Sequence, residues 1–179
     1  NALTRLAETA QHFHLDDTTH RILSAKPILK DRRSGGGKRL RSGVYCSGII
    51  ATNNYHDIVL FKTNIGHGGE CIDEILENRD RSLPPPIVMS DALSSNRPTV
   101  CEVVWSLCHV HSRRKFFEIK DDFPEECDYV LSCYDKIFKT ESRARKLGLT
   151  DAERLALHKK ESEPVFNKMV AWSRQQIEK

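Results

Sequence analysis

Short apolar runs dominate the first 110 residues of the chain, and helical periodicity dominates the rest. Residues 2–12 repeat their apolar positions at helical spacing, which predicts a first helix. Three β-favouring runs follow, at 13–23, 43–51 and 57–63, and Asn53-Asn54 makes a turn between the last two. We expect these runs to pair as an antiparallel meander.

The middle of the chain predicts one more helix and two more strands. Residues 67–78 are amphipathic with a helical period. Pro84–Pro86 stops any helix and leads into a short apolar strand, 87–89, that ends at Asp91. After a break at Arg97-Pro98, residues 100–110 predict a fifth strand.

The last third of the chain is helical. Residues 112–147 predict helix with an interruption near Pro124, and Thr150 with Glu153 three residues later forms a capping box for a final helix. A meander, a helix, two strands and then helices match a ribonuclease-H-like α/β fold. In that fold the first and fourth strands are neighbours, so their ends bring Asp16 and Asp91 together. We expect a core over 1–120 and a helical insertion or appendage over 121–179.

Composition narrows the class of protein only slightly. The 179 residues, 39% hydrophobic and 30% charged, suit one globular domain with or without an appendage. A net charge of +3 permits a polyanionic partner without demanding one. The sequence contains no secretory signal and no apolar run long enough to span a bilayer, so we expect a cytoplasmic protein without a membrane partner. It begins at Asn1 rather than Met, which suggests a piece of a longer protein.

Two acids stand at the ends of apolar runs and are candidate metal ligands. Asp16 and Asp17 are adjacent on a predicted strand, so their side chains face opposite ways and only one can join a shared site. Asp91 follows a buried-looking strand. Carboxylates that converge from two strands suit Mg²⁺ or Mn²⁺ and phosphoryl transfer on a nucleic acid. Asp is also common in turns and caps, and the acids alone favour that interpretation.

A block of His, Arg and Lys follows the fifth strand. Arg113 and Arg114 are candidate phosphate contacts, although a solvated helix start is an equal alternative. Cys108, His109 and His111 lack the paired spacing of structural zinc sites, so we expect reduced cysteines and no zinc. We predict a flexible, basic loop over 30–42; its glycines lack the context of a P-loop.

Taken together, these segments resemble the insertion-sequence-66 family of bacterial transposases from about residue 10 to the end. Residues 14–18 (His-Leu-Asp-Asp-Thr) resemble its His-x-Asp-Glu-Thr segment, and 90–93 stand where it has Thr-Asp-Gly-Tyr. Residues 108–116 (Cys-His-Val-His-Ser-Arg-Arg-Lys-Phe) closely resemble its Cys-Trp-Ala-His-Ala-Arg-Arg-Lys-Phe signature, and 137–141 its Leu-Tyr-x-x-Glu segment. The departures include Asp17 for Glu and His109 for Trp.

The resemblance implies the catalytic core of a DDE transposase, in which acids bind Mg²⁺ or Mn²⁺ and cut and join DNA. It assigns Asp16 and Asp91 as catalytic metal ligands, with His111, Arg113 and Arg114 on DNA. The implied partners are transposon ends, target DNA and other transposase domains or subunits, in a bacterial cytoplasm.

The third acid of that family is expected in an Asn-Asn-x-x-Glu-Arg segment, which these residues do not contain. Glu141 and Glu118 are internal candidates, and a structural or regulatory role for Glu141 is equally open. The metal site is therefore expected to be incomplete. The alternative function is a non-catalytic, nucleic-acid-binding remnant of the same fold.

Overall fold

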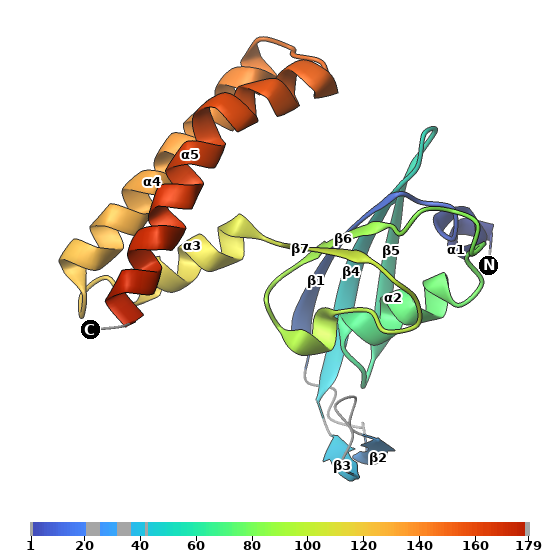
Figure 1. The fold of residues 1–179 in the computed structure, drawn as a ribbon. Coiled ribbons are helices and arrows are strands. Elements are labelled where there is room, and N and C mark those ends of the chain that lie inside the picture. Colours follow the sequence, from blue (N-terminus) through green and yellow to red (C-terminus); the bar gives the residue numbers. More distant parts are fainter. Residues whose placement is uncertain (1, 21–25, 32–36, 42, 178–179) are drawn as a thin grey trace. The chain divides into compact units, whose positions relative to one another are not determined.

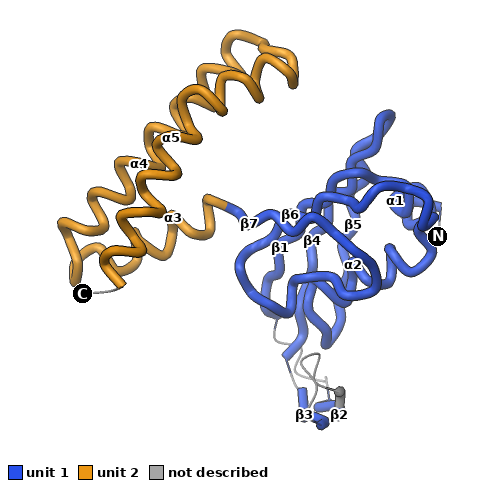
Figure 2. Tube along the Cα trace, in the orientation of Figure 1, with its two compact units in different colours: residues 1–108 blue, residues 109–179 orange. Residues whose placement is uncertain are grey.

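The computed structural model describes residues 2–20, 26–31, 37–41 and 43–177. The chain forms two compact units, Asn1–Cys108 and His109–Lys179 (Figure 2). Each unit has its own buried apolar cluster, and each is described separately below.

The first unit is a mixed five-stranded sheet in the order β5-β4-β1-β6-β7 (Figure 1). Its elements are α1 (Ala2–Ala7), β1 (His12–His20), β4 (Val44–Thr52), β5 (Asp57–Asn64), α2 (Gly68–Leu76), β6 (Ile87–Ser90), the 3₁₀ turn η1 (Ser94–Asn96) and β7 (Val104–Leu107). The pairs β1–β4 and β4–β5 are antiparallel, and β1–β6 and β6–β7 are parallel. The predicted meander and the predicted neighbours, the first and fourth strands, are confirmed. This order is compatible with a ribonuclease-H-like arrangement.

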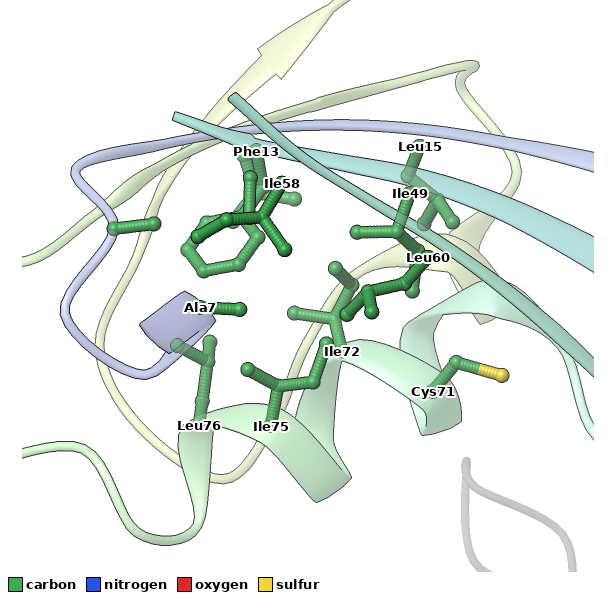
Figure 3. Close-up of a cluster of buried hydrophobic side chains, with 13 residues drawn as sticks. Ala7, Phe13, Leu15, Ile49, Ile58, Leu60, Cys71, Ile72, Ile75 and Leu76 are labelled. Atoms are coloured by element: carbon green, nitrogen blue, oxygen red, sulfur yellow. The ribbon is translucent and has the colours of Figure 1, made fainter. Parts of the chain in front are cut away.

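Alternation along β1 explains which face of the sheet is covered. Phe13 and Leu15 are buried, whereas the alternate residues His12, His14 and Asp16 are exposed. The buried face packs against α2, whose apolar stripe gathers under the strands (Figure 3). That cluster includes Ile49, Ile58, Leu60, Cys71, Ile72, Ile75 and Leu76. Each large side chain buried there contributes roughly 1.5–3 kcal/mol, so this cluster stabilises the register of β1, β4, β5 and β6, which all supply residues to it.

A buried arginine, Arg79, holds together the starts of β1, which contains Asp16, and of β6, which precedes Asp91. Arg79 is 5% exposed and donates hydrogen bonds to the carbonyls of Glu8, Ala10 and Pro84 at 2.7–3.0 Å. Ala10 lies just before β1 and Pro84 just before β6. Three carbonyl acceptors offset the cost of burying the guanidinium, so this contact joins the entry points of the two strands.

Three local predictions differ from the structure. The segment expected to be a flexible loop contains β2 (Ile28–Asp31) and β3 (Lys38–Arg41), which pair as an antiparallel two-stranded sheet; 32–36 and 42 lie outside the described residues. The fifth strand ends at Leu107 rather than at 110, because its partner β6 ends at Ser90 and offers no further ladder. The first helix ends at Ala7 instead of continuing to 12, since the chain there turns into β1.

The second unit contains α3 (His109–Glu118), α4 (Pro124–Lys146) and α5 (Asp151–Ile177). The interruption predicted near Pro124 is confirmed, because Pro124 starts α4, where its missing N–H costs nothing. Gly148 has a φ of 62°, the left-handed conformation that ends a helix. The predicted capping box is present: Glu153 accepts from the Thr150 amide at 2.9 Å.

Candidate metal and DNA site

Asp16 lies in β1, and Asp91 is the first residue after the neighbouring strand β6. The parallel register pairs His12 with Ile87 and His14 with Met89. Continuing that register by two residues sets Asp16 opposite Asp91, the first residue after β6. Side chains in one row of a sheet share a face, so the exposed Asp16 belongs to the face that α2 does not cover. Asp91 lies in the turn that follows β6.

Asp91 is held in place by the loop that follows it. Its Oδ1 accepts hydrogen bonds from the Leu93 amide at 3.0 Å and from Asn96 Nδ2 at 2.9 Å, and Asn96 is 1% exposed. Both bonds end on the same oxygen, so they orient the carboxylate without engaging Oδ2. Before it, Ser90 Oγ accepts from Trp105 Nε1 at 2.9 Å, which ties the end of β6 to β7. The second acid therefore sits on a braced turn.

Asp17 faces the opposite side of the sheet, where it binds the start of α2. Its Oδ1 accepts from Ser47 Oγ at 2.7 Å, and its Oδ2 accepts from the Gly68 amide at 2.8 Å. Gly68 is the first residue of α2, so Asp17 caps that helix from a strand and complements the positive end of its dipole. His67 Nδ1 lies 3.7 Å from the same carboxylate. These contacts assign Asp17 to the core side and leave Asp16 on the exposed face.

Gly68 is needed for this cap. A Cβ there would lie 2.4 Å from Leu15 Cδ1 and 2.7 Å from Asp17 Oδ1. The absence of a side chain lets the helix start approach β1 closely enough to meet the carboxylate. Sequence reasoning missed this role for Asp17 and Gly68; the His-Gly-Gly run at the start of the amphipathic segment 67–78 was the available signal.

The predicted DNA contacts belong to α3 in the second unit. Arg113 is half-buried and its Nη2 lies 3.6 Å from Asp135 Oδ1 of α4, whereas Arg114 is exposed. The two guanidiniums thus point to different sides of α3, and His111 is half-buried on the same helix. Of the three, Arg114 presents its charge most fully to solvent.

His109 is a packing residue of the second unit. Its ring lies 5.7 Å from that of Tyr134 and 5.0 Å from that of Phe166, centroid to centroid. Burial lowers the pKa of His109, because the charged imidazolium loses its hydration there. The imidazole therefore packs among aromatic rings at the position where the family signature has Trp.

Glu141 binds the two long helices of the second unit to each other. Its carboxylate accepts from Arg145 Nε at 2.6 Å, from Arg154 Nε at 2.9 Å and Nη2 at 2.6 Å, and contacts His158 Nε2 at 3.0 Å. Burial raises the pKa of Glu141, but the hydrogen bonds from Arg145, His158 and Arg154 outweigh it and lower the pKa to about 2. This crowding favours the structural role left open above. The other internal candidate, Glu118, pairs with Lys115 at 2.8 Å.

In the part of the chain that the structure describes, no group of three or more His, Cys, Asp or Glu side chains is placed to hold a metal ion. All six cysteines are free thiols. None of the described helices is both long and apolar enough to cross a lipid bilayer.

The fold and the row of acids define an α/β protein with a mixed five-stranded sheet and a separate helical unit. The sequence matches the family described as "Transposase IS66 family" over residues 1–179. The chain therefore belongs to the IS66 transposase family, as the motif resemblance implied.

A curated relative is the "Uncharacterized protein y4hP" of Sinorhizobium fredii (strain NBRC 101917 / NGR234). It is 31% identical over an alignment that covers 39% of this chain and 15% of the relative. The aligned part of this chain is thus a small share of that relative's length. No solved structure matches the chain.

Proposed function

We propose that the first unit is the ribonuclease-H-like core of a DDE transposase, which cuts and joins DNA with a divalent metal. One observation carries the proposal: the parallel β1–β6 register, continued two residues past its last pair, His14–Met89, sets Asp16 opposite Asp91. These are also the two residues that match acids of the family's motifs. The whole-chain family match supports the reaction class.

The donor set fits Mg²⁺ or Mn²⁺. These hard cations take carboxylate oxygens and retain several waters, so two carboxylates and a substrate phosphate suit one ion. Asp16 and Asp91 would hold it. The bound ion would polarise the phosphodiester and lower the pKa of an attacking water or 3′-hydroxyl.

Other residues position the two candidate acids and the DNA. Asn96 and the Leu93 amide orient Asp91, and Asp17 holds α2 beneath β1. On the second unit, Arg114, with Arg113 and His111, would contact DNA phosphates, which positions the DNA without reading its sequence.

We further propose that these 179 residues bind DNA weakly and do not cut it alone. The family's Asn-Asn-x-x-Glu-Arg segment is not among them, and the Glu141 carboxylate is already engaged by Arg145, Arg154 and His158. The same observation favours a second candidate, a DNA-binding remnant without catalysis. Metal binding at Asp16 and Asp91 separates the two, because a remnant has no need to retain it.

The test counts bound Mn²⁺ by the loss of the free-ion electron paramagnetic resonance signal. Wild type should bind about one ion, and Asp16→Asn and Asp91→Asn should each weaken binding at least tenfold. Asp57→Asn is the matched control, since it removes a carboxylate from the same face in another row, where Asp57 accepts from Thr52 Oγ1 at 2.8 Å. Equal Mn²⁺ binding in all four proteins would refute the site.

Nuclease activity is assayed in parallel on supercoiled DNA with Mn²⁺. We expect no nicking by the 179-residue chain. Nicking that both Asp16→Asn and Asp91→Asn abolish would show that an internal acid completes the site.

A further inference from the structure

One row of residues crosses the sheet of the first unit on the face away from α2. Phe61 of β5 pairs with Gly48 of β4, and Gly48 pairs with Asp16 of β1. The β1–β6 register has His14–Met89 as its last pair, and extending it by two residues continues the row to Asp91. An aromatic ring therefore shares a row with both candidate metal ligands.

Phe61 is 76% exposed, although it stands in the middle of a paired strand. A Cβ on Gly48 would lie 3.6 Å from Phe61 Cε1 and 3.9 Å from the Asp16 carbonyl oxygen. The ring thus leans across β4 toward β1, over the space that the missing Gly48 side chain leaves open. Most of its surface remains available to a ligand.

The composition of this face favours a polar ligand over a covering protein segment. On β1 the face presents His12, His14, Asp16 and Thr18, all exposed. A protein that covered it would bury four polar side chains, each at a cost unless it gained a hydrogen-bond partner. The other face of β1, which is covered by α2, presents the apolar side chains Phe13 and Leu15 instead. Apolar exposure is concentrated beside Phe61, where Val59 is 51% and Ile50 43% exposed.

We propose that Phe61 stacks against an unpaired DNA base next to the phosphate that Asp16 and Asp91 engage. The inference rests on the proposed function and adds a substrate class to it: DNA with a single-stranded or frayed nucleotide at the site. Strands are about 4.8 Å apart, so Phe61 stands roughly 10 Å from Asp16 along the row, within reach of a neighbouring nucleotide. Duplex bases are already stacked on both faces, so an exposed protein ring selects unpaired ones.

The 179-residue chain is titrated into a short single-stranded DNA in the presence of EDTA, and binding is measured by fluorescence anisotropy. The DNA carries 2-aminopurine, whose fluorescence is quenched when the base stacks. A duplex of the same sequence is titrated for comparison. Phe61→Ala should weaken single-strand binding about 5- to 100-fold, the usual range for one base–aromatic stack, and relieve the quenching of 2-aminopurine. Duplex binding should change less than twofold. Tyr55→Ala is the matched control, because Tyr55 is an 84% exposed aromatic in a turn outside the row, and it should bind as wild type does.

Two further variants separate stacking from packing. Phe61→Trp should retain single-strand binding, because it keeps a π face. Phe61→Leu keeps an apolar cover over Gly48 without that face, and it should bind as Phe61→Ala does. Wild-type binding by Phe61→Leu would overturn the proposal in favour of a packing role. Dimerisation of wild type that Phe61→Ala abolishes in sedimentation would overturn it in favour of a contact between copies of this chain.

The two proposals fail separately. The Mn²⁺ titration on Phe61→Ala should match wild type, since the ring is not a ligand. Normal Mn²⁺ binding with unchanged DNA binding by Phe61→Ala would refute stacking alone. A third outcome would refute the metal site alone: the wild-type chain binds no Mn²⁺, yet it quenches 2-aminopurine and Phe61→Ala does not. The stacking role of Phe61 would then stand.

Discussion

The substitution Glu141→Gln tests whether Glu141 is a structural acid or a catalytic one. Glu141→Gln keeps the size of the side chain and removes the charge that Arg145, Arg154 and His158 share. The pKa of Glu141 falls from 4.5 to about 2 in the folded protein. A difference of about 2.5 units corresponds to roughly 3.4 kcal/mol at 1.36 kcal/mol per unit, which is an upper bound.

Solvent screening reduces that value. The side chain of Arg145 is 74% exposed and that of Arg154 is 44% exposed, so water screens both ion pairs. We expect Glu141→Gln to lower the free energy of unfolding by about 1–2 kcal/mol at pH 7. The pH dependence has a defined sign: a carboxyl with a depressed folded-state pKa stabilises the protein above its unfolded pKa. This stabilisation is present above about pH 5 and is lost as the pH falls from there toward 2.

The assay is urea unfolding followed by circular dichroism at pH 7, 5 and 3. Wild type should lose its advantage over Glu141→Gln as the pH falls, and the two curves should approach each other at pH 3. Glu163→Gln, which removes an exposed charge from α5, is the control and should follow wild type. Equal stabilities at pH 7, or a difference that persists unchanged at pH 3, would refute the reasoning. A wild-type advantage that appears only with Mn²⁺ would instead favour Glu141 as a metal ligand.

Three further predictions test the cap, the aromatic cluster and the DNA contacts. Gly68→Ala should destabilise the first unit by about 1–3 kcal/mol in urea unfolding, because the new Cβ meets Leu15 at 2.4 Å; unchanged stability would contradict the close approach. His109→Phe should be neutral or stabilising by up to about 1 kcal/mol, since the buried Nδ1 of His109 has no hydrogen-bond partner among the described residues, and a loss above about 1 kcal/mol in the same assay would contradict a packing role. Arg114→Ala should weaken DNA binding alike on all sequences and lower the salt slope by about 0.9 in anisotropy titrations; a sequence-dependent loss would indicate base contacts instead.

Apart from β2 and β3, the order of elements and the identity of the strand neighbours followed from the sequence. The β-favouring runs at 13–23 and 57–63, and the helical periods in 67–78 and after 112, are local properties of the sequence. The capping box at Thr150 and the helix start at Pro124 are also local signals. The two errors with the clearest cause depended on pairing: β2 needed β3 as a partner, and β7 ended where β6 ended.

The site shows the same division. From the sequence alone, adjacent Asp16 and Asp17 had to face opposite ways, because side chains alternate along a strand. Which of them is exposed was decided by tertiary packing: α2 begins at Gly68, close enough to β1 for Asp17 to cap it, so Asp17 belongs to the core side and Asp16 to the exposed face. Likewise, the sequence around Glu141 does not predict that Arg154 and His158 of α5 contact it. Local periodicity specifies the elements, whereas the partners of a charged side chain depend on distant segments that only the folded chain brings within hydrogen-bond reach.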